Sequence, residues 1–277
     1  MGANIKLLLR SYKIYARMDF LWLIRDTKYC LLQIFADLIS SLSSILIILQ
    51  LAKRFQNIGG LDYYELMLML GISVAVFGLY DMFFANYNNG LVCRIIGRGQ
   101  IDHYLIQPVP LFIQIITRGF APFSGSSQLI MAVIMITLAL RKLSRLTLSN
   151  MISALICSVG ALIIIVCMIY LHSTIAFFNP ASGEEVGTIV LEMFRENSIF
   201  PLGELLGGLQ IFFSSVIPVG AIAWIPTMII TRWKKEYMMI YGMMALSFMV
   251  ITIWIFKRGI QYYVQKGSGR YSGFGHR

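Results

Sequence analysis

The feature that most constrains the fold is the run at residues 148–178, which contains no Asp, Glu, Lys or Arg. A helix needs about 20 mainly apolar residues to cross a bilayer, so we expect this longer run to be tilted, kinked or extended into the cytosol. Apolar runs of crossing length recur along the chain. The predicted spans are 29–52, 64–86, 119–140, 148–178, 208–230 and 237–257. The sequence therefore predicts an all-α polytopic membrane protein with six transmembrane helices.

The composition supports a membrane protein and argues against a nucleic-acid-binding one. Hydrophobic residues make up 58% of the chain and charged residues only 13%, whereas soluble domains carry about 25% charged residues. The formal net charge is +10. Its Lys and Arg residues lie in short segments between apolar runs, where such residues face phospholipid headgroups and set orientation. We therefore expect membrane lipids, and not nucleic acid, to be their partners.

The distribution of basic residues predicts the orientation in the membrane. With six spans, both termini lie on one side, and 15 of the 23 Lys and Arg residues fall there while 8 fall on the other side. Basic residues favour the cytosolic side, so the termini are expected to be cytosolic. Two basic clusters, at 141–145 and 231–235, lie on the outer side in this arrangement and run against the trend.

Residues 1–27 are expected to form an amphipathic helix lying in the membrane interface. The apolar residues that can gather on one side are Leu7, Leu8, Tyr12, Ile14, Tyr15, Phe20, Leu21 and Ile24, and the basic residues on the other are Lys6, Arg10, Lys13 and Arg17. This pattern is typical of interfacial helices. The alternative is a frayed basic tail. Basic residues interrupt the apolar positions, so the segment is not a cleavable signal peptide.

The segment 91–107, between the second and third spans, is predicted to be a cytosolic amphipathic helix. Its apolar positions at helical spacing are Leu91, Ile95, Ile101 and Leu105, and Arg94 and Arg98 lie four apart on another face. We expect an interruption near Gly97 and Gly99 and an end before Pro108 and Pro110. The apolar face has three possible roles: lying on the membrane, filling a groove in a soluble partner, or anchoring a solvated loop.

Three stretches carry a family resemblance. The first is Gly99-x-Ile101-Asp102-x-Tyr104-Leu105-Ile106-x-Pro108, the second is 198–226 with its Ile217, Pro218 and Pro226, and the third is the short basic ending at 259–275. With the N-terminal helix and six spans, they resemble the membrane subunits of ABC-2-type transporters, especially bacterial permeases that work with a separately encoded ATPase. The resemblance covers nearly the whole chain. Where the family pattern has Arg before the loop proline, this chain has Gln107.

The resemblance implies that segment 91–107 is a coupling segment resting on the ATPase. The implied coupling residues are Arg94, Arg98, Ile101, Asp102, Tyr104 and Leu105, with Ile101 and Leu105 anchored in an apolar groove of that partner. Pro218 and Pro226 are the implied gating or helix-bend positions. The chain has no GxxxxGK[ST] sequence to cradle ATP phosphates, so the partner subunit is expected to bind ATP and Mg²⁺ and to hydrolyse the ATP.

The resulting expectation is a single transmembrane permease domain over 1–277, with an interfacial helix at 1–27 and a cytosolic tail at 258–277. It is not itself an enzyme and has no cofactor, catalytic residue or metal site of its own. Its partners are the ATPase, a second permease that is identical or related, membrane lipids, and a small-molecule or peptide substrate. Export of a hydrophobic or amphipathic compound across the bacterial cell membrane is the favoured function.

Two other functional classes compete with this one. Asp37 and His172 lie within apolar spans and Asp81 near the end of another. Ionisable residues in spans mark ion or proton pathways in many carriers, so an ion- or proton-coupled secondary transporter is the alternative. A membrane-embedded enzyme is disfavoured because no HExxH, paired-acid or Ser/His set appears. The four cysteines lack ligand spacing and indicate core residues. Five acidic residues within 179–204 indicate a second amphipathic helix.

Overall fold

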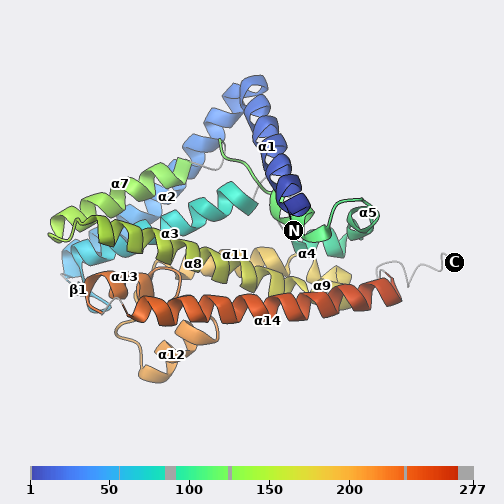
Figure 1. The fold of residues 1–277 in the computed structure, drawn as a ribbon. Helices are drawn as coiled ribbons and strands as arrows, with labels where there is room; N and C mark the ends of the chain where they lie inside the picture. The colour runs from blue at the N-terminus through green and yellow to red at the C-terminus, as the bar shows by residue number, and fades with distance from the viewer. Residues whose placement is uncertain (1, 56, 85–91, 124–126, 234–235, 268–277) are drawn as a thin grey trace.

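The described part of the chain, residues 2–55, 57–84, 92–123, 127–233 and 236–267 of a computed structural model, is almost entirely helical (Figure 1). In order, its elements are α1 Gly2–Arg25, α2 Thr27–Phe55, β1 Asn57–Ile58, β2 Leu61–Asp62, α3 Tyr63–Phe84, α4 Val92–Gly97, α5 Ile101–Leu105, α6 Leu111–Arg118, α7 Ser127–Lys142, α8 Leu148–Ser173, α9 Ile175–Phe178, α10 Pro180–Gly183, α11 Val186–Asn197, α12 Gly207–Ser215, α13 Trp224–Thr231 and α14 Tyr237–Lys266. The predicted all-α class is confirmed. Leu91 and residues 268–277, which belong to the predicted coupling segment and tail, lie outside the described residues.

The long helices α3, α7, α8 and α14 run beside one another and define two ends of a bundle (Figure 1). One end, called the hairpin end, carries β1, β2 and α13. The other, called the α5 end, carries α4, α5 and α9. The main apolar core lies between the long helices and includes Phe77, Tyr80, Ile165 and Phe194. A second, smaller cluster of buried residues lies at the α5 end.

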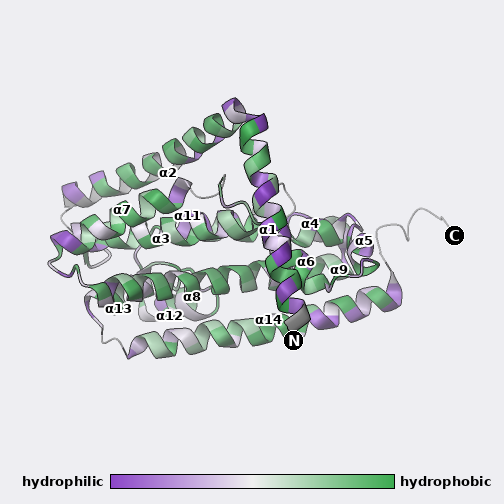
Figure 2. Ribbon diagram, turned by 45° about the horizontal axis from the view of Figure 1, so that its top comes forward, coloured by the Kyte–Doolittle hydropathy of each residue, from purple (hydrophilic) through white to green (hydrophobic). Residues whose placement is uncertain are grey.

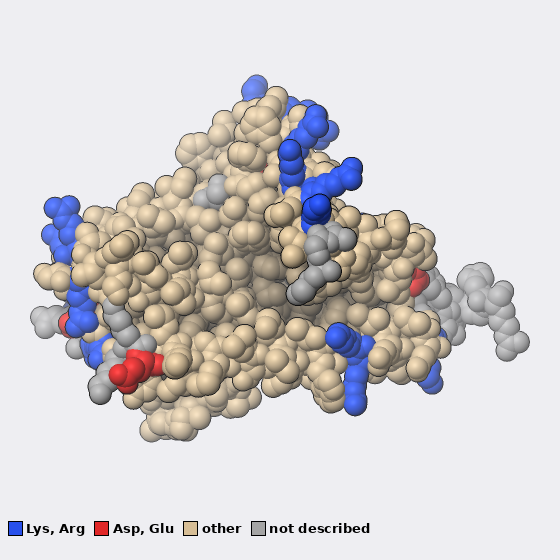
Figure 3. Space-filling model, in the orientation of Figure 1, with Lys and Arg blue, Asp and Glu red and all other residues tan. Residues whose placement is uncertain are grey.

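Helices α3, α8 with α9, and α14 are both long enough and apolar enough to cross a membrane. Figure 2 shows hydrophobic residues along the middle of these helices and hydrophilic residues near the ends of α2, α7 and α14. On the face drawn in Figure 3, Lys and Arg gather toward the two ends and leave an uncharged band between them. The chain is therefore a membrane protein whose apolar band is bounded by charged ends.

The long apolar run 148–178 folds as α8 followed by α9, with Thr174 between the two helices. Thr147 caps the start of α8 by accepting a hydrogen bond from the backbone of Asn150. At the far end, the hydroxyls of Ser173 and Thr174 donate to the carbonyls of Ile169 and Leu171. Hydroxyls that bond back to the preceding turn commonly bend a helix. The chain then continues as α9, which packs on α4 at the α5 end.

The predicted helix at 208–230 is wrong. The structure has two short helices there, α12 and α13, joined by turns through 216–223. Pro218 has no backbone N–H and restricts Ile217, so a continuous helix cannot pass this point. Neither short helix approaches the roughly 20 residues that a crossing needs. Pro226 lies in the first turn of α13, where its missing N–H leaves no bond unmade.

Instead, residues 186–206 run along the bundle from the α5 end to the hairpin end. Helix α11 starts at the α5 end, where Glu185 meets Arg94, and packs along α8. Ser198 then hydrogen-bonds to Ser73 of α3 at 2.8 Å. Gly203 finally packs against the backbone carbonyl of Gly59 in the hairpin. The second amphipathic helix predicted within 179–204 is present as α11, and its apolar side, including Val190 and Phe194, lies in the main core.

Helix α1 lies across the direction of the long helices, at the level where α4 begins (Figure 1). The structure thus has a helix close to the predicted bounds 1–27, and its place in the membrane interface stays a prediction. Its buried Asp19 carboxylate accepts a hydrogen bond from the backbone of Phe123 at 2.7 Å, and Tyr12 packs edge-on against Phe120. These contacts fix α1 to the segment that follows α6. The predicted span at 119–140 contains α7, which begins only at Ser127.

Candidate coupling site and apolar groove

The segment between α3 and α6 folds as two short helices because of one glycine. Gly99 has a φ of +69°, in the left-handed region that glycine adopts at little cost. The backbone N–H groups of Gly99 and Gln100 bond back to the carbonyls of Ile96 and Ile95, which ends α4. Helix α5 then starts in a new direction. The predicted interruption near Gly97 and Gly99 is confirmed.

Helix α5 turns two of its predicted coupling residues inward. Ile101 is 1% exposed and Tyr104 is 4% exposed. Both belong to the α5-end cluster, whose buried members are Val92, Ile95, Ile96, Ile101, Tyr104, Ile115, Ala176, Phe177 and Tyr263. The expectation that Ile101 inserts into a partner's groove is therefore wrong, because its side chain is already enclosed by this chain.

Tyr104 and the loop after it are fixed onto α6. The Gln114 amide donates hydrogen bonds to the carbonyls of Tyr104 at 2.9 Å and Val109 at 2.7 Å. The Arg118 guanidinium lies over the Tyr104 ring, 3.9 Å from its centroid, in a cation–π contact. The packing of Ile101 and Tyr104, together with the hydrogen bonds from Gln114, therefore holds α5 in one position.

A small exposed surface remains on α5 and the residues after it. Leu105 is 38% exposed and Ile106 is 80% exposed, an unusual position for two adjacent large aliphatic side chains. The other members of this exposed surface, Asp102 and His103, are exposed polar residues. We call these four residues the α5 surface. Ile106 was not singled out from the sequence, because a four-residue period from Ile101 to Leu105 passes over it.

The two predicted coupling arginines are paired with acidic residues far along the chain. The Arg94 guanidinium donates to both carboxylate oxygens of Glu185, at 2.7 and 3.2 Å, and Arg98 forms an ion pair with Glu184. The pairs join α4 to the segment between α10 and α11. A Cβ added to Gly97 would lie 2.8 Å from the carbonyl oxygen of Pro180, so only glycine allows this close approach.

The Arg94–Glu185 pair makes stability at this end depend on pH. Hydrogen bonds from Arg94 hold the pKa of the Glu185 carboxyl below its usual value. A lowered folded-state pKa means that the stabilisation is complete above the unfolded-state pKa of about 4.3 and is lost as the pH falls through the folded value.

We expect Glu185→Gln to lower the midpoint of thermal unfolding at pH 7 by a small amount, because the pair is exposed. The difference from the unmodified chain should vanish once the pH lies below the lowered folded-state pKa, because the carboxyl is then protonated in both the folded and the unfolded state. Glu192→Gln is the matched control, because Glu192 forms no ion pair with any of the described residues. A Glu185→Gln effect that persists unchanged to the lowest pH would contradict this assignment.

The ionisable residues within the bundle are partly paired. Arg195 of α11 donates to Asp81 of α3 at 3.0 Å and lies over the Phe77 ring. The Nδ1 atom of His172 lies 2.7 Å from the carbonyl oxygen of Met168. Asp37 of α2 is half-buried and lies within electrostatic range of Asp81 and Arg195. The sequence marked Asp37, Asp81 and His172 but gave no sign that Arg195 reaches Asp81.

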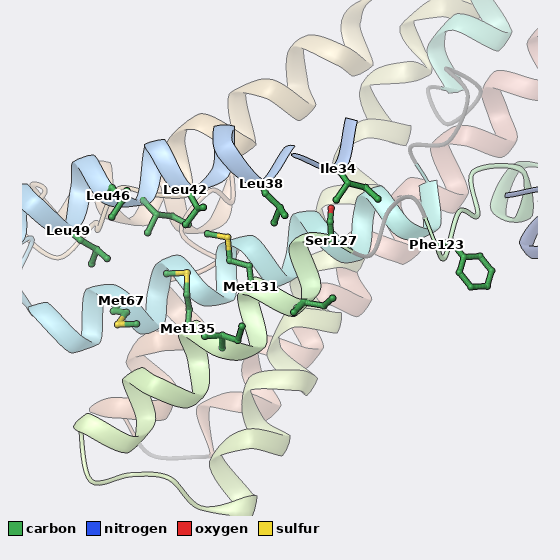
Figure 4. Close-up of a pocket in the computed structure, with 13 residues that line it drawn as sticks. Ile34, Leu38, Leu42, Leu46, Leu49, Met67, Phe123, Ser127, Met131 and Met135 are labelled. Carbon is green, nitrogen blue, oxygen red and sulfur yellow. The ribbon is translucent and has the colours of Figure 1, made fainter. Parts of the chain in front are cut away.

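A groove of about 620 Å³ runs between α2 on one side and α3 and α7 on the other (Figure 4). The α2 residues that line it are Ile34, Leu38, Leu42, Ile45, Leu46 and Leu49. The opposite side includes Met67, Met131 and Met135 (Figure 4). Flexible thioether side chains adapt to ligands of varied shape, so the groove suits an apolar guest. No group of His, Cys, Asp and Glu in the described residues could hold a metal ion.

The sequence of the chain decides its family. A family model described as ABC-2 family transporter protein matches residues 38–267. The chain belongs to the ABC-2 transporter family. It is a membrane permease component of an ABC transporter, as the resemblance indicated. No curated protein and no solved structure matches the chain. The ABC-2 permease family implies an association with an ABC ATPase subunit.

Proposed function

We propose that this permease exports a hydrophobic or amphipathic compound, driven by a separate ATPase that rests on the α5 surface. The observation that carries the proposal is the exposure of Leu105 and Ile106 on a helix that is otherwise locked in place. Exposed aliphatic side chains beside polar ones are typical of a site where a helix docks into a partner's groove. The ATPase supplies the ATP and Mg²⁺ chemistry.

The support beneath α5 suggests how movement of the ATPase reaches the spans. Ile101 and Tyr104 pack in one cluster with Phe177 of α9 and Tyr263 of α14. Helix α9 continues α8, and Arg94 and Arg98 connect α4 to the start of α11. A push on the α5 surface is therefore passed to α8, α11 and α14 through packed side chains and ion pairs. Tightly packed contacts of this kind transmit displacement with little loss.

The proposed topology places the α5 end and both termini in the cytosol of a bacterial cell, with six crossings. These crossings are α2, α3, the segment containing α7, α8, residues 186–206 and α14. Helix α1 lies in the inner interface, and the hairpin, α12 and α13 face outward. A second permease, identical or related, completes the pathway. Residues 1–277 act as one transmembrane permease domain.

The alternative of an ion- or proton-coupled carrier has less support. Such a carrier needs ionisable side chains that converge and exchange ions near the middle of the membrane. Asp81 is instead bonded to Arg195, and His172 Nδ1 lies beside a backbone carbonyl. Of Asp37, Asp81 and His172, only Asp37 has no direct hydrogen-bond or ion-pair partner among the described residues.

The topology has a direct test with single cysteines in a background where the four buried native cysteines are replaced. Gln100→Cys at the α5 end should resist an impermeant thiol reagent added to intact cells and react after permeabilisation. Glu204→Cys should react in intact cells, because Gly203 beside it packs on the hairpin. Both positions are exposed.

The two cysteines distinguish a fifth crossing formed by residues 186–206 from the fifth crossing at 208–230 that the sequence predicts. If 208–230 were the fifth crossing, Glu204 would lie on the same side as Gln100 and both cysteines would resist the reagent. Labelling of Gln100→Cys in intact cells would place the α5 surface outside and remove the basis for docking a cytosolic ATPase.

A further inference from the structure

Helix α2 carries an acidic residue, Asp37, beside the residues that line the groove between α2 and α7, although Asp37 does not itself line it. Figure 4 shows Ile34 and Ser127 close together, toward the end of the groove where Phe123 lies. Asp37 lies one residue before Leu38, which also lines the groove, and one helical turn after Ile34. Gln128, the residue after Ser127, hydrogen-bonds to Asp81. The apolar groove and the charged group of Asp37, Asp81 and Arg195 are therefore neighbours.

The charges of this group do not balance. Arg195 is the positive residue in it, and it is held in place by two contacts, the bond to Asp81 at 3.0 Å and the Phe77 ring at 4.9 Å. Asp37 receives no hydrogen bond and forms no ion pair within the described residues. Two carboxylates against one guanidinium leave one negative charge beside the groove. An unpaired carboxylate within an apolar span is unfavourable and marks a functional position.

The dimensions of the groove match an elongated or bulky apolar guest. Along α2, the lining extends from Ile34 to Leu49, which corresponds to about 22 Å of helix. The lining is aliphatic and thioether apart from Phe123 and Ser127, so the Ser127 hydroxyl is the one polar side chain among the lining residues. A charge that could select a guest is found only beside the lining, at Asp37 on α2.

We infer that the groove binds a lipophilic cation, with the apolar body between α2 and α7 and the positive group beside Asp37. The inference rests on the proposed function and narrows its hydrophobic or amphipathic substrate to compounds with one positive charge. Charge complementarity decides this occupant, because a lipid chain would fill the groove without neutralising Asp37. The bound cation would balance the excess charge that the described residues leave.

The test compares two probes of the same shape and opposite charge, tetraphenylphosphonium and tetraphenylborate. Binding of each radiolabelled ion to the purified full-length permease in a neutral detergent is measured by equilibrium dialysis. We expect saturable binding of tetraphenylphosphonium and none of tetraphenylborate. Asp37→Asn should weaken tetraphenylphosphonium binding about tenfold, the effect of removing a nearby opposite charge in a medium of intermediate dielectric. Partitioning into the detergent is the same for both proteins and cancels in their comparison.

Three further variants test whether binding depends on the charge of Asp37, on the space in the groove, or only on the general integrity of the fold. Asp37→Glu should retain binding, because the charge remains. Met131→Trp should weaken it by filling the groove while Asp37 stays in place. Asp26→Asn is the matched control, since Asp26 pairs with Arg25 at the corner between α1 and α2 and does not line the groove.

The inference is overturned if tetraphenylphosphonium does not bind, if Asp37→Asn binds it as well as the unmodified chain, or if tetraphenylborate binds equally. The last result would identify a groove for lipid or any apolar guest. Co-purification of the ATPase is measured on the same samples. Loss of probe selectivity with the ATPase still bound would defeat this inference alone, whereas absence of the ATPase would defeat the proposed function.

Discussion

Leu105→Glu combined with Ile106→Glu is expected to abolish association with the ATPase while the permease stays folded. Ile106 is 80% exposed and Leu105 is 38% exposed, so the substitutions disturb far fewer contacts within the chain than a change at a buried position would. Burying an aliphatic side chain in a partner contributes about 1.5 to 3 kcal/mol, and two glutamates would also have to be desolvated. Loss of both contributions corresponds to a weakening of at least about 100-fold. Co-purification and ATP-driven transport are the measurements.

Ile101→Glu provides the matched contrast four residues away on the same short helix. Its side chain is enclosed in the α5-end cluster, so the substitution buries a charge with no partner. This should destabilise the permease by several kcal/mol, on the order of 4, and reduce its yield in the membrane. The double variant should instead match the unmodified chain in yield and in size-exclusion profile. Undiminished ATPase binding by the double variant would show that the α5 surface is not the docking site.

Several elements could be predicted because local chemistry decides them. The start of α8 at the Thr147 cap and the break in the coupling segment at Gly99 depend on neighbouring residues alone. The extent of the run at 148–178 likewise follows from its unbroken apolar composition. These signals are local, so a single sequence carries them in full.

Hydropathy could not predict that residues 186–206, rather than 208–230, run along the bundle. Helix α11 carries Glu192, Arg195 and Glu196 and reads as a surface helix. Arg195 is nevertheless accommodated inside the bundle, because Asp81 of α3 pairs with it from 114 positions earlier in the chain. The more apolar α12 has no buried residue and contributes little to the core. The apolar side of α11 and the Asp81 partner for Arg195 together let this charged segment pack within the bundle, and hydropathy alone does not indicate that partner.

The contacts of the coupling site also could not be predicted from the spacing of residues in the sequence. Helical spacing placed Ile101 and Leu105 on one face, but a five-residue helix that starts after a left-handed glycine turns Ile101 inward and leaves Leu105 partly exposed. Glu184 and Glu185 were recognised as acidic residues of a loop. Their pairing with Arg98 and Arg94 joins positions 86 and 91 residues apart, which no periodicity in the sequence indicates.

The largest effect expected of this permease is an absolute dependence of transport on the ATPase. The chain has no phosphate-binding loop, and within the part of the chain that the structure describes Asp81 is bonded to Arg195. Substitution of the phosphate-binding Lys of the ATPase should therefore abolish transport, because that Lys contacts the ATP phosphates. A pH gradient should neither replace ATP nor be required when ATP is present.

The most direct measurement uses liposomes that contain the permease with or without its ATPase, and follows a panel of cationic and neutral hydrophobic dyes. The proposed function predicts dye movement only when the ATPase and ATP are both present, and predicts that this movement persists after an ionophore collapses the pH gradient. Dye movement driven by an imposed pH gradient in liposomes that hold the permease alone would contradict it.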